Sequence, residues 1–402
     1  MAEKLRVGVI FGGRSGEHEV SLVSAQGIMN AMDKEKYEVI PIGISKEGRW
    51  LTSGEPMKLL QSPPAKGAGE QGSKGAEVLS RAKEQEQGSR SPEQSEGTGA
   101  GERGLVPADR RELVPGTREA GFPQVDVVFP VLHGPYGEDG TVQGLLELAD
   151  IPYVGAGVFG SALGMDKIAM KAIFRNHGLP VVEHLALKRR DWERDPEAMM
   201  ELIEKELGYP CFIKPANLGS SVGITKVHWR SELAPALNLA ARYDRKMLAE
   251  QAVNAREIEV SVLGNDDPIA SVPGEIIPCR EFYDYIAKYI DDRSELIIPA
   301  DLPPELTRRI QELAIAAFLA VDCAGMARVD FLLDRDTGEL YVGELNTIPG
   351  FTPISMYHKL WEASGISYSE LIDRLIELAL DRHADSRRSK TSYSPEEFGP
   401  SV

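Results

Sequence analysis

The sequence predicts an α/β protein with more than one domain. Its 402 residues leave room for two or three domains and a sizeable core. A βαβ pattern opens the chain, because apolar runs at residues 6–11 and 38–44 flank a stretch with helical spacing at 20–32. Towards the other end, two strand-like runs between residues 327 and 345 flank a polar turn, which indicates a β-hairpin.

Composition excludes several classes of partner. Hydrophobic residues make up 42% and charged residues 27% of the chain, as in ordinary globular proteins. The net charge of −17 argues against binding to nucleic acid or to an anionic membrane. The longest apolar run, residues 313–321, is too short to span a bilayer. Three widely spaced cysteines fit neither a zinc site nor a disulfide framework, and the first strand follows Met1 too closely for a signal peptide. We expect a cytoplasmic protein.

The predicted hairpin gathers polar side chains on one face. Side chains alternate along a strand, so Arg328 and Asp330 share a face, as do Glu344 and Asn346. The core-facing set is expected to be Val329, Phe331, Val342 and Leu345. Oxygen ligands of this kind suit Mg²⁺, which also binds nucleotide phosphates. A solvated sheet face is the usual alternative for charges on a strand, but the E-L-N-T-I-P-G run that follows favours a metal–phosphate site.

This E-L-N-T-I-P-G run, Glu344 to Gly350, following Arg328-Val329-Asp330, closely resembles D-alanine–D-alanine ligases of the ATP-grasp superfamily. We expect the similarity to cover most of residues 5–381, with about 55–120 and the last twenty residues outside it. The resemblance implies three α/β domains, with ATP between the second and the third. These are a doubly wound substrate-binding domain at 1–156, a central domain at 157–253, a C-terminal domain at 254–381 with lid and metal site, and a flexible tail at 382–402.

Residues 61–104 differ from the rest of the chain. They contain no aromatic residue and few large aliphatic ones, and they are rich in Gly, Ser, Gln, Glu and Lys. Such a segment cannot bury enough apolar surface to offset the entropy of ordering it. We predict a disordered insertion without chemistry, which would make this chain longer than the usual members of the family.

Two motifs in the first domain resemble the family's substrate site. A glycine-rich turn at 12–19 carries Glu17, which on residue type alone is a helix-start carboxylate favoured by the helix dipole. The resemblance implies that Glu17 binds the ammonium group of the first D-alanine. After the strand at 125–132 comes H-G-P-Y-G-E-D-G, at the edge where an open α/β sheet presents ligand groups. A lone histidine there is more often structural, but the resemblance places His133 near the first substrate's carboxylate.

Two other motifs resemble the sites of other enzyme classes but lack the surroundings that those sites require. Residues 155–160 fit G-x-G-x-x-G, but no acidic residue follows a second strand some 20 positions later, so an NAD site is rejected. Residues 219–223 fit G-x-S-x-G, the nucleophile elbow of serine hydrolases, which must lead from a strand into a helix. The residues that follow have the character of a strand, and a serine hydrolase stays a minor alternative.

The segment 214–223 is better interpreted as a loop that covers phosphate. Glycines let the backbone approach phosphate oxygens, Ser220 and Ser221 add hydroxyl donors, and Lys214 supplies charge. Lys167 opens a predicted helix at 167–176. The resemblance implies that both lysines contact ATP phosphates and that Ser220 is linked to the substrate-binding glutamate.

Further binding residues come from the resemblance alone. It assigns Glu250 to the adenine edge and Glu257 to the ribose hydroxyls, on strands predicted at 246–252 and 257–263. A long connection containing residues 282–289 resembles the family's active-site lid, since loops this long inside a compact domain are often lids. The resemblance implies that Lys288 and Tyr289 of this lid face the reacting groups and that Lys288 also binds ATP. It implies that Gly350 and Ser355 bind the second substrate.

The implied reaction joins two D-alanines with cleavage of ATP to ADP and phosphate, through an acyl phosphate, for peptidoglycan synthesis. Two Mg²⁺ (or Mn²⁺) ions would be held by Asp330, Glu344 and Asn346, and Arg328 would stabilise the oxyanion. Three alternatives stay open: D-lactate or D-serine as acceptor, another ATP-grasp ligase, and an inactive nucleotide-binding regulator. The expected assembly is a homodimer.

Overall fold

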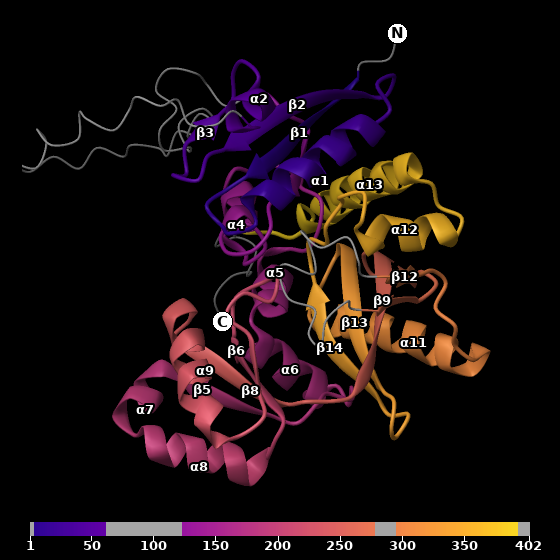
Figure 1. The fold of residues 1–402 in the computed structure, drawn as a ribbon. Coiled ribbons are helices and arrows are strands. Elements are labelled where there is room, and N and C mark those ends of the chain that lie inside the picture. Colours follow the sequence, from indigo (N-terminus) through magenta and orange to yellow (C-terminus); the bar gives the residue numbers. More distant parts are fainter. Residues whose placement is uncertain (1–3, 62–122, 278–294, 393–402) are drawn as a thin grey trace, which may run out of the picture.

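The computed structural model describes residues 4–61, 123–277 and 295–392 (Figure 1). All but the first residue of the predicted 61–104 insertion, and the lid residues Lys288 and Tyr289, therefore lie outside the described residues. The described chain forms three sheets, of four, four and six strands, which we call the first, middle and third sheet in order along the chain.

The first sheet has the strand order β3-β2-β1-β4 and confirms the predicted βαβ pattern. Its core strand β1 pairs in parallel with β2 on one side and with β4 on the other. The elements of this part are β1 (Leu5–Gly12), α1 (His18–Ala31), β2 (Tyr37–Ile44), β3 (Trp50–Leu51), α2 (Pro56–Gln61), β4 (Val127–Val131), α4 (Thr141–Leu148) and α5 (Val158–Met165). The carboxyl ends of β1 and β4 run directly into the segments that carry Glu17 and His133.

The middle sheet is antiparallel, with the order β5-β8-β6-β7. Leu233, Leu237 and Ala240 of α9 are fully buried in the hydrophobic cluster of this sheet. The elements are α6 (Lys167–Asn176), β5 (His184–Lys188), α7 (Arg189–Arg194), α8 (Pro196–Glu206), β6 (Cys211–Pro215), β7 (Thr225–Val227), α9 (Arg230–Tyr243) and β8 (Lys246–Gln251). Helix α6 has the predicted bounds because Asp166 caps it, accepting hydrogen bonds from the backbone N–H groups of Ile168 and Ala169.

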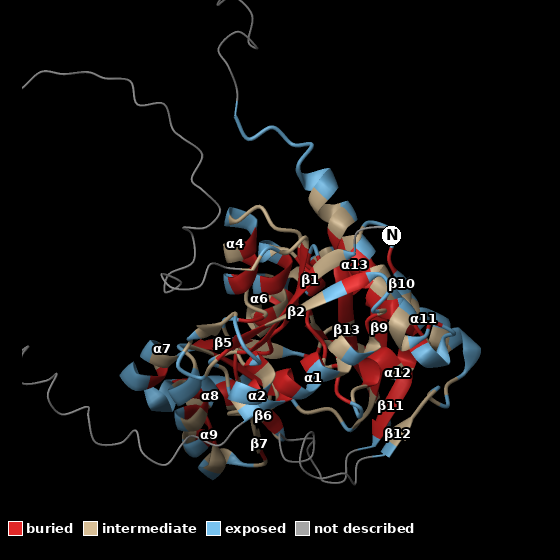
Figure 2. Cartoon of the chain, turned by 90° about the horizontal axis from the view of Figure 1, so that it is seen from above, coloured by how far each residue is buried: buried red, intermediate tan, exposed pale blue. Residues whose placement is uncertain are grey.

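The third sheet carries the predicted hairpin, in the order β12-β11-β9-β13-β14 with β10 beside β9. Alternate residues of β13 are buried, and all four predicted core-facing residues are buried beneath helix α11. The elements are β9 (Ala255–Gly264), β10 (Ile269–Ala270), β11 (Gly274–Ile277), β12 (Glu295–Ile297), α11 (Pro304–Ala320), β13 (Gly325–Asp334), β14 (Leu340–Asn346), α12 (Met356–Ala363) and α13 (Tyr368–Ser386). Figure 2 shows buried residues along the strands and exposed residues on the outer faces of the helices.

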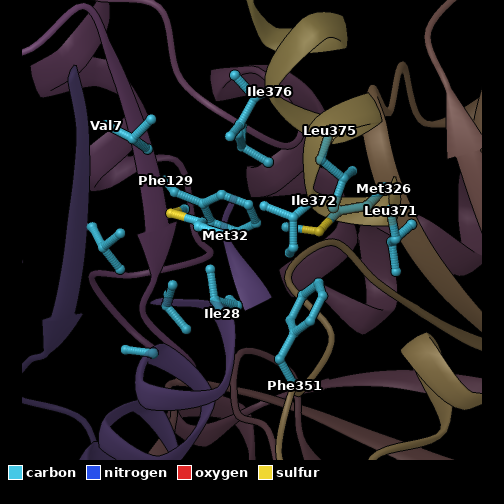
Figure 3. Packing of buried hydrophobic residues seen from close by; sticks show 14 of the residues in the cluster. Val7, Ile28, Met32, Phe129, Met326, Phe351, Leu371, Ile372, Leu375 and Ile376 are labelled. Carbon is cyan, nitrogen blue, oxygen red and sulfur yellow. The ribbon is translucent and has the colours of Figure 1, made fainter. Parts of the chain in front are cut away.

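A single hydrophobic cluster ties the C-terminal helices to the first sheet. It contains Phe129 of β4, Ile28 of α1, Ile372 of α13 and Phe351 (Figure 3). The Phe351 ring lies edge-on to Phe129 at a centroid distance of 6.1 Å and to Tyr357 at 5.4 Å. The chain therefore returns from the hairpin to pack against its own beginning, as Figure 1 also shows.

The last helix, α13, is held against the first part of the chain. It continues to Ser386, past residue 382, where the domain division implied by the resemblance begins the tail. The Arg382 guanidinium lies 4.3 Å from the centre of the Tyr153 ring and donates a 3.1 Å hydrogen bond to the Tyr153 carbonyl oxygen. His383 Nε2 lies 3.1 Å from Asp150 Oδ1. These contacts hold the last turns of the helix, which helical periodicity in the sequence could not reveal. Among the described residues, we find no helix with both the length and the apolar character needed to cross a bilayer.

Replacing Phe351 with alanine tests whether this cluster joins the two ends of the chain. We expect Phe351→Ala to lower the free energy of unfolding by about 3–5 kcal/mol, because a fully buried aromatic side chain leaves a cavity. The measurement is urea denaturation followed by circular dichroism. Phe159→Ala, which truncates a side chain that is 61% exposed, is the control and should change stability by no more than about 0.5 kcal/mol. Equal effects of the two substitutions would contradict this description of the core.

Candidate active site

Two adjoining cavities lie between the middle and third sheets. The larger, of about 800 Å³, is lined by Lys171, Lys214 and Glu250 on one side and by Glu257, Asp330 and Glu344 on the other. The smaller, of about 40 Å³, is lined among others by Glu138, Lys167, Ser220 and Asn346. Lys167 and Glu344 line both cavities, so the two cavities adjoin at these residues.

The hairpin brings its four predicted side chains together. Arg328 pairs with Asn346 and Asp330 with Glu344 across β13 and β14, which confirms the predicted common face. The Arg328 guanidinium donates two 2.7 Å hydrogen bonds to Asp330, and the Asn346 amide donates one of 3.1 Å to the same carboxylate. Burial alone would lower the pKa of Arg328, but the carboxylates of Asp330 and Glu259 hold it well above its usual range.

This donor set fits a magnesium ion that completes its shell elsewhere. Asp330, Glu344 and Asn346 offer carboxylate and amide oxygens, the hard ligands that Mg²⁺ prefers. Within the described ranges, no group of three or more His, Cys, Asp or Glu side chains is arranged to hold an ion. The protein would therefore supply only part of the coordination, and phosphate oxygens and water would supply the rest, as is common for Mg²⁺.

Each of the two predicted phosphate lysines contacts a carboxylate at the cavities. Lys167 Nζ donates a 3.0 Å hydrogen bond to the Leu218 carbonyl oxygen and lies 3.3 Å from Glu344 Oε2. Lys214 Nζ lies 2.6 Å from Glu250 Oε1. Each lysine is thus held at the cavity wall by an oxygen atom that an incoming phosphate could replace.

A third lysine, Lys171, was missed in the sequence analysis. Its Nζ lies 2.8 Å from Glu250 Oε2, and the two side chains are only 2% and 3% exposed. Burial alone would raise the pKa of Glu250, but Lys171 and Lys214 together lower it to about 2. The signal was its position four residues after Lys167, which places both on one face of α6.

The loop over the cavities contacts the first sheet through Glu17. The Ser220 hydroxyl donates a hydrogen bond to Glu17 Oε1. Two glycines permit this contact, since a Cβ on Gly219 or Gly134 would lie 2.9 or 2.7 Å from Glu17 Oε2. Glu17 precedes α1 without capping it through its side chain, so its carboxylate faces the loop instead of the helix. After the loop the chain enters strand β7, which rules out the geometry of a nucleophile elbow.

His133 and Glu138 both interact electrostatically with Glu17. His133 is buried, with Nδ1 3.1 Å from the Ile348 carbonyl oxygen and Nε2 3.4 Å from Ser24 Oγ. Its pKa is lowered by burial, and Glu17 opposes this shift. Glu138, also missed in the sequence analysis, accepts a 2.9 Å hydrogen bond from the Gly134 backbone N–H. Burial and the nearby Glu17 raise the pKa of Glu138 to about 8.

The remaining predicted residues are placed as follows. Glu257 lines the larger cavity and Ser221 lines both cavities. Gly350 and Ser355 line neither cavity, but they lie next to each other, since a Cβ on Gly350 would be 2.7 Å from Ser355 Oγ. Ser355 Oγ also accepts a 3.0 Å hydrogen bond from the Thr352 backbone N–H. Lys288 and Tyr289 cannot be placed, because they lie outside the described residues.

Two sheets face each other across a large cavity, with Lys214 and Glu250 on one, a carboxylate hairpin on the other and two further lysines on helix α6, and this arrangement is that of an enzyme of the ATP-grasp type. Comparison with known proteins specifies the family. The model of the N-terminal domain of D-Ala-D-Ala ligases matches residues 6–156, and the model of the C-terminal domain matches residues 173–377. The chain belongs to the D-alanine–D-alanine ligase family.

Individual relatives agree with this assignment. The chain is 50% identical over 392 residues to a D-alanine–D-alanine ligase of Natranaerobius thermophilus, covering 98% of this chain and 99% of that one. It is 52% identical over 388 residues to one of Thermoanaerobacter pseudethanolicus, covering 96% and 99%. Because these alignments span nearly all of both chains, the expectation that the 61–104 insertion lengthens this chain beyond the family is wrong for these relatives.

Solved structures share the fold. A D-alanine–D-alanine ligase from Coxiella burnetii is 37% identical with a TM-score of 0.75, covering 96% of this chain and 97% of that one. VanG, a D-Ala:D-Ser ligase from Enterococcus faecalis, is 35% identical with a TM-score of 0.72, covering 94% and 100%. The predicted fold class, a multidomain α/β ATP-grasp ligase, is confirmed.

The raised pKa of Glu138 predicts a pH-dependent stability. In the unfolded chain this carboxyl titrates near 4.5, so between pH 4.5 and about 8 the folded protein holds more protons than the unfolded chain. The contribution of Glu138 to stability is therefore fully present below pH 4.5 and is lost as the pH rises to about 8. We expect Glu138→Gln to flatten the decrease in the free energy of unfolding over this range, measured by urea denaturation at several pH values.

Glu38→Gln, which changes an exposed carboxylate on β2, is the control and should leave the pH dependence as in the unaltered protein. An unchanged slope in Glu138→Gln would show that this carboxyl is not held protonated in the fold.

Proposed function

We propose that this protein joins two D-alanine molecules into D-alanyl-D-alanine with cleavage of ATP to ADP and phosphate. The observation that carries the proposal is the hydrogen bond between Ser220 of the phosphate-covering loop and Glu17 of the first sheet. This hydrogen bond connects the loop that would cover the nucleotide phosphates with the carboxylate that would bind the ammonium group of an amino acid. The names of the close relatives support the same reaction.

The chemistry requires activation of a carboxylate. A carboxylate does not accept an amine directly, because oxide is a poor leaving group. In the proposed reaction the carboxylate of the first D-alanine attacks the γ-phosphorus of ATP, which releases ADP and forms an acyl phosphate. Glu17 would hold the ammonium group of this D-alanine, with His133 near its carboxylate. The Ser220–Glu17 contact would then fix the amino acid relative to the phosphates.

The cations at the cavity wall suit the transfer of a phosphoryl group. Lys167 and Lys214 would exchange their present carboxylate and carbonyl partners for phosphate oxygens. Bound Mg²⁺ would neutralise charge on the transferring phosphoryl group, held by Asp330, Glu344 and Asn346. We propose two such ions, as the sequence resemblance implies. Glu250 and Glu257 would contact the adenine and ribose ends of the nucleotide in the larger cavity.

The second half of the reaction needs an oxyanion stabiliser and protection from water. The amine of the second D-alanine attacks the acyl carbon, forming the C–N bond, and phosphate leaves as the C–O bond breaks. Arg328 would stabilise the negative charge on the tetrahedral intermediate, with Gly350 and Ser355 near the second carboxylate. We propose that Lys288 and Tyr289 belong to a lid that excludes water from the acyl phosphate.

The acceptor could also be a hydroxy acid or D-serine. VanG, a structural neighbour, is named a D-Ala:D-Ser ligase, which makes D-serine the alternative acceptor to test. The relatives with about 50% identity carry the D-alanine name, which favours D-alanine here. Lys288-Tyr289 resembles the pair in dipeptide-forming enzymes, and Tyr289 brings no cation that would repel an ammonium group. We further propose a cytoplasmic homodimer that serves peptidoglycan synthesis.

Removing Arg328 tests the oxyanion role. We expect Arg328→Ala to lower turnover by roughly 10²–10³-fold while ATP binding stays nearly intact, because an oxyanion donor acts mainly in the transition state. Turnover is measured by phosphate release with D-alanine and ATP, and binding by calorimetry. Arg256→Ala is the control, since Arg256 forms an ion pair with Glu275 in the same sheet but on its other face. Near-normal turnover in Arg328→Ala would rule out the proposed role.

A competition experiment tests the acceptor. Given equal D-alanine, D-lactate and D-serine together with ATP, the protein should form mainly D-alanyl-D-alanine from neutral to alkaline pH. D-Lactate should compete best in acid, where the attacking amine of D-alanine is mostly protonated and cannot attack. Product chromatography measures the outcome. A predominance of D-Ala–D-Lac or D-Ala–D-Ser at pH 7 to 8 would overturn the proposed specificity.

A further inference from the structure

A carboxylate on the strand next to the hairpin also contacts Arg328. Glu259 of β9 pairs with Asp330 of β13, which pairs in turn with Glu344 of β14, so three carboxylates form one row across three strands. Glu259 Oε2 lies 3.0 Å from Arg328 Nε. The Glu259 side chain is 8% exposed and that of Arg328 is 17% exposed. None of the roles proposed above involves Glu259.

The other neighbour of Glu259 is an apolar surface. On β11 the residue opposite Glu259 is Gly274, which has no side chain to separate β11 from the helix above it. A Cβ on Gly274 would lie 2.3 Å from Met356 Cε and 2.7 Å from Leu360 Cδ2, so side chains of α12 press onto this strand. Because residues paired across strands share a face, Glu259 has Arg328 on one side and this apolar surface on the other. Limited access of water strengthens its attraction to the guanidinium.

Asp330 cannot accept its hydrogen bonds from Arg328 and bind a metal ion equally well at the same time. Both of its carboxylate oxygens accept hydrogen bonds from Arg328, and Oδ2 also accepts one from Asn346. A cation bound to the same oxygens competes with the guanidinium for them. Glu259 lies on β9, the strand that pairs with β13, and it lines the larger cavity beside Asp330. The Arg328 Nε–H that donates to Asp330 Oδ1 also lies 3.0 Å from Glu259 Oε2, so Glu259 is placed to accept this N–H when Asp330 releases it.

We propose that Glu259 is a positioning residue that holds the Arg328 guanidinium over the site while Asp330 binds the metal–nucleotide. This inference rests on the proposed role of Arg328 and adds a specific partner to it. Without Glu259, the Arg328 guanidinium would lose its orientation when Asp330 binds the metal ion. The nucleotide would still bind, but the charge on the transition state would be stabilised less well.

The direct test is Glu259→Gln, which keeps the size of the side chain and removes its charge. We expect turnover to fall roughly 5- to 50-fold with little change in the KM for ATP, in line with the usual coupling between residues in contact. The control is Glu275→Gln, whose carboxylate is equally buried and forms hydrogen bonds of 2.9 and 2.6 Å with Arg256 on the opposite face of the sheet. This control should lose stability and keep its turnover.

A double-mutant cycle with Arg328→Ala separates positioning from a general structural role. If Glu259 acts through Arg328, Glu259→Gln adds no further loss of turnover in the Arg328→Ala protein. In urea denaturation of the metal-free and nucleotide-free protein, the two substitutions should also be non-additive, because Arg328→Ala already leaves Glu259 without its guanidinium partner. Unfolding thus provides a measurement that is independent of catalysis.

Several outcomes would overturn the inference. Normal turnover in Glu259→Gln would do so, and so would additive losses of turnover in the double mutant. Additive losses of stability would show that the two side chains do not interact. Normal turnover in Arg328→Ala would refute the proposed role of the arginine and with it the inference. In that case the unfolding cycle would still report the Glu259–Arg328 contact, so the two failures can be told apart.

Discussion

The compensation of buried carboxylates by a few shared cations is the constraint on which this site depends. In a chain of net charge −17, Lys167, Lys214 and Arg328 nevertheless lie within contact of Glu344, Glu250 and Asp330, at the cavities or beside them. Glu250, whose side chain is only 3% exposed, would be strongly destabilising without a partner, so its two lysine partners, Lys171 and Lys214, stabilise the fold. An anionic nucleotide can replace the carboxylates as the partner of these cations. Metal ions can then bind the carboxylates that lose their cation.

The packing of the C-terminal helices makes this arrangement possible. Phe351 lies in the cluster shared by α1, β4 and α13, five residues after the last residue of the hairpin. His133 Nδ1 lies 3.1 Å from the carbonyl oxygen of Ile348 in the same segment. The first sheet and the hairpin are therefore held together by a hydrophobic core on one side and by polar contacts on the other. A change in this core would alter the distance between Glu17 and the hairpin without touching either.

Local patterns in the sequence predicted the elements well but not their distant contacts. Alternation along residues 327–345 correctly predicted the shared face of Arg328 and Asp330, because the pairing of a hairpin follows from its turn. Lys171, Glu138 and Glu259 were missed, since each acquires its partner from an element far away in the chain or from a strand pairing that sequence order does not show. The contact between Arg382 near the end of α13 and Tyr153 could not be predicted for the same reason. The domain boundaries and the residue roles stay predictions.

Glu250 in the middle sheet and Arg328 in the hairpin are each shared by two partners of opposite charge. Glu250 is shared by Lys214 at 2.6 Å and Lys171 at 2.8 Å, while Arg328 is shared by Asp330 at 2.7 Å and Glu259 at 3.0 Å. If Lys214 moves to a phosphate, Glu250 keeps Lys171, so no carboxylate is left buried and unpaired. If Asp330 moves to a metal ion, Arg328 keeps Glu259. Leaving a buried charge without a partner costs more free energy than most ion pairs contribute. A second partner for Glu250 and for Arg328 therefore lowers the free-energy cost of exchanging the first partner.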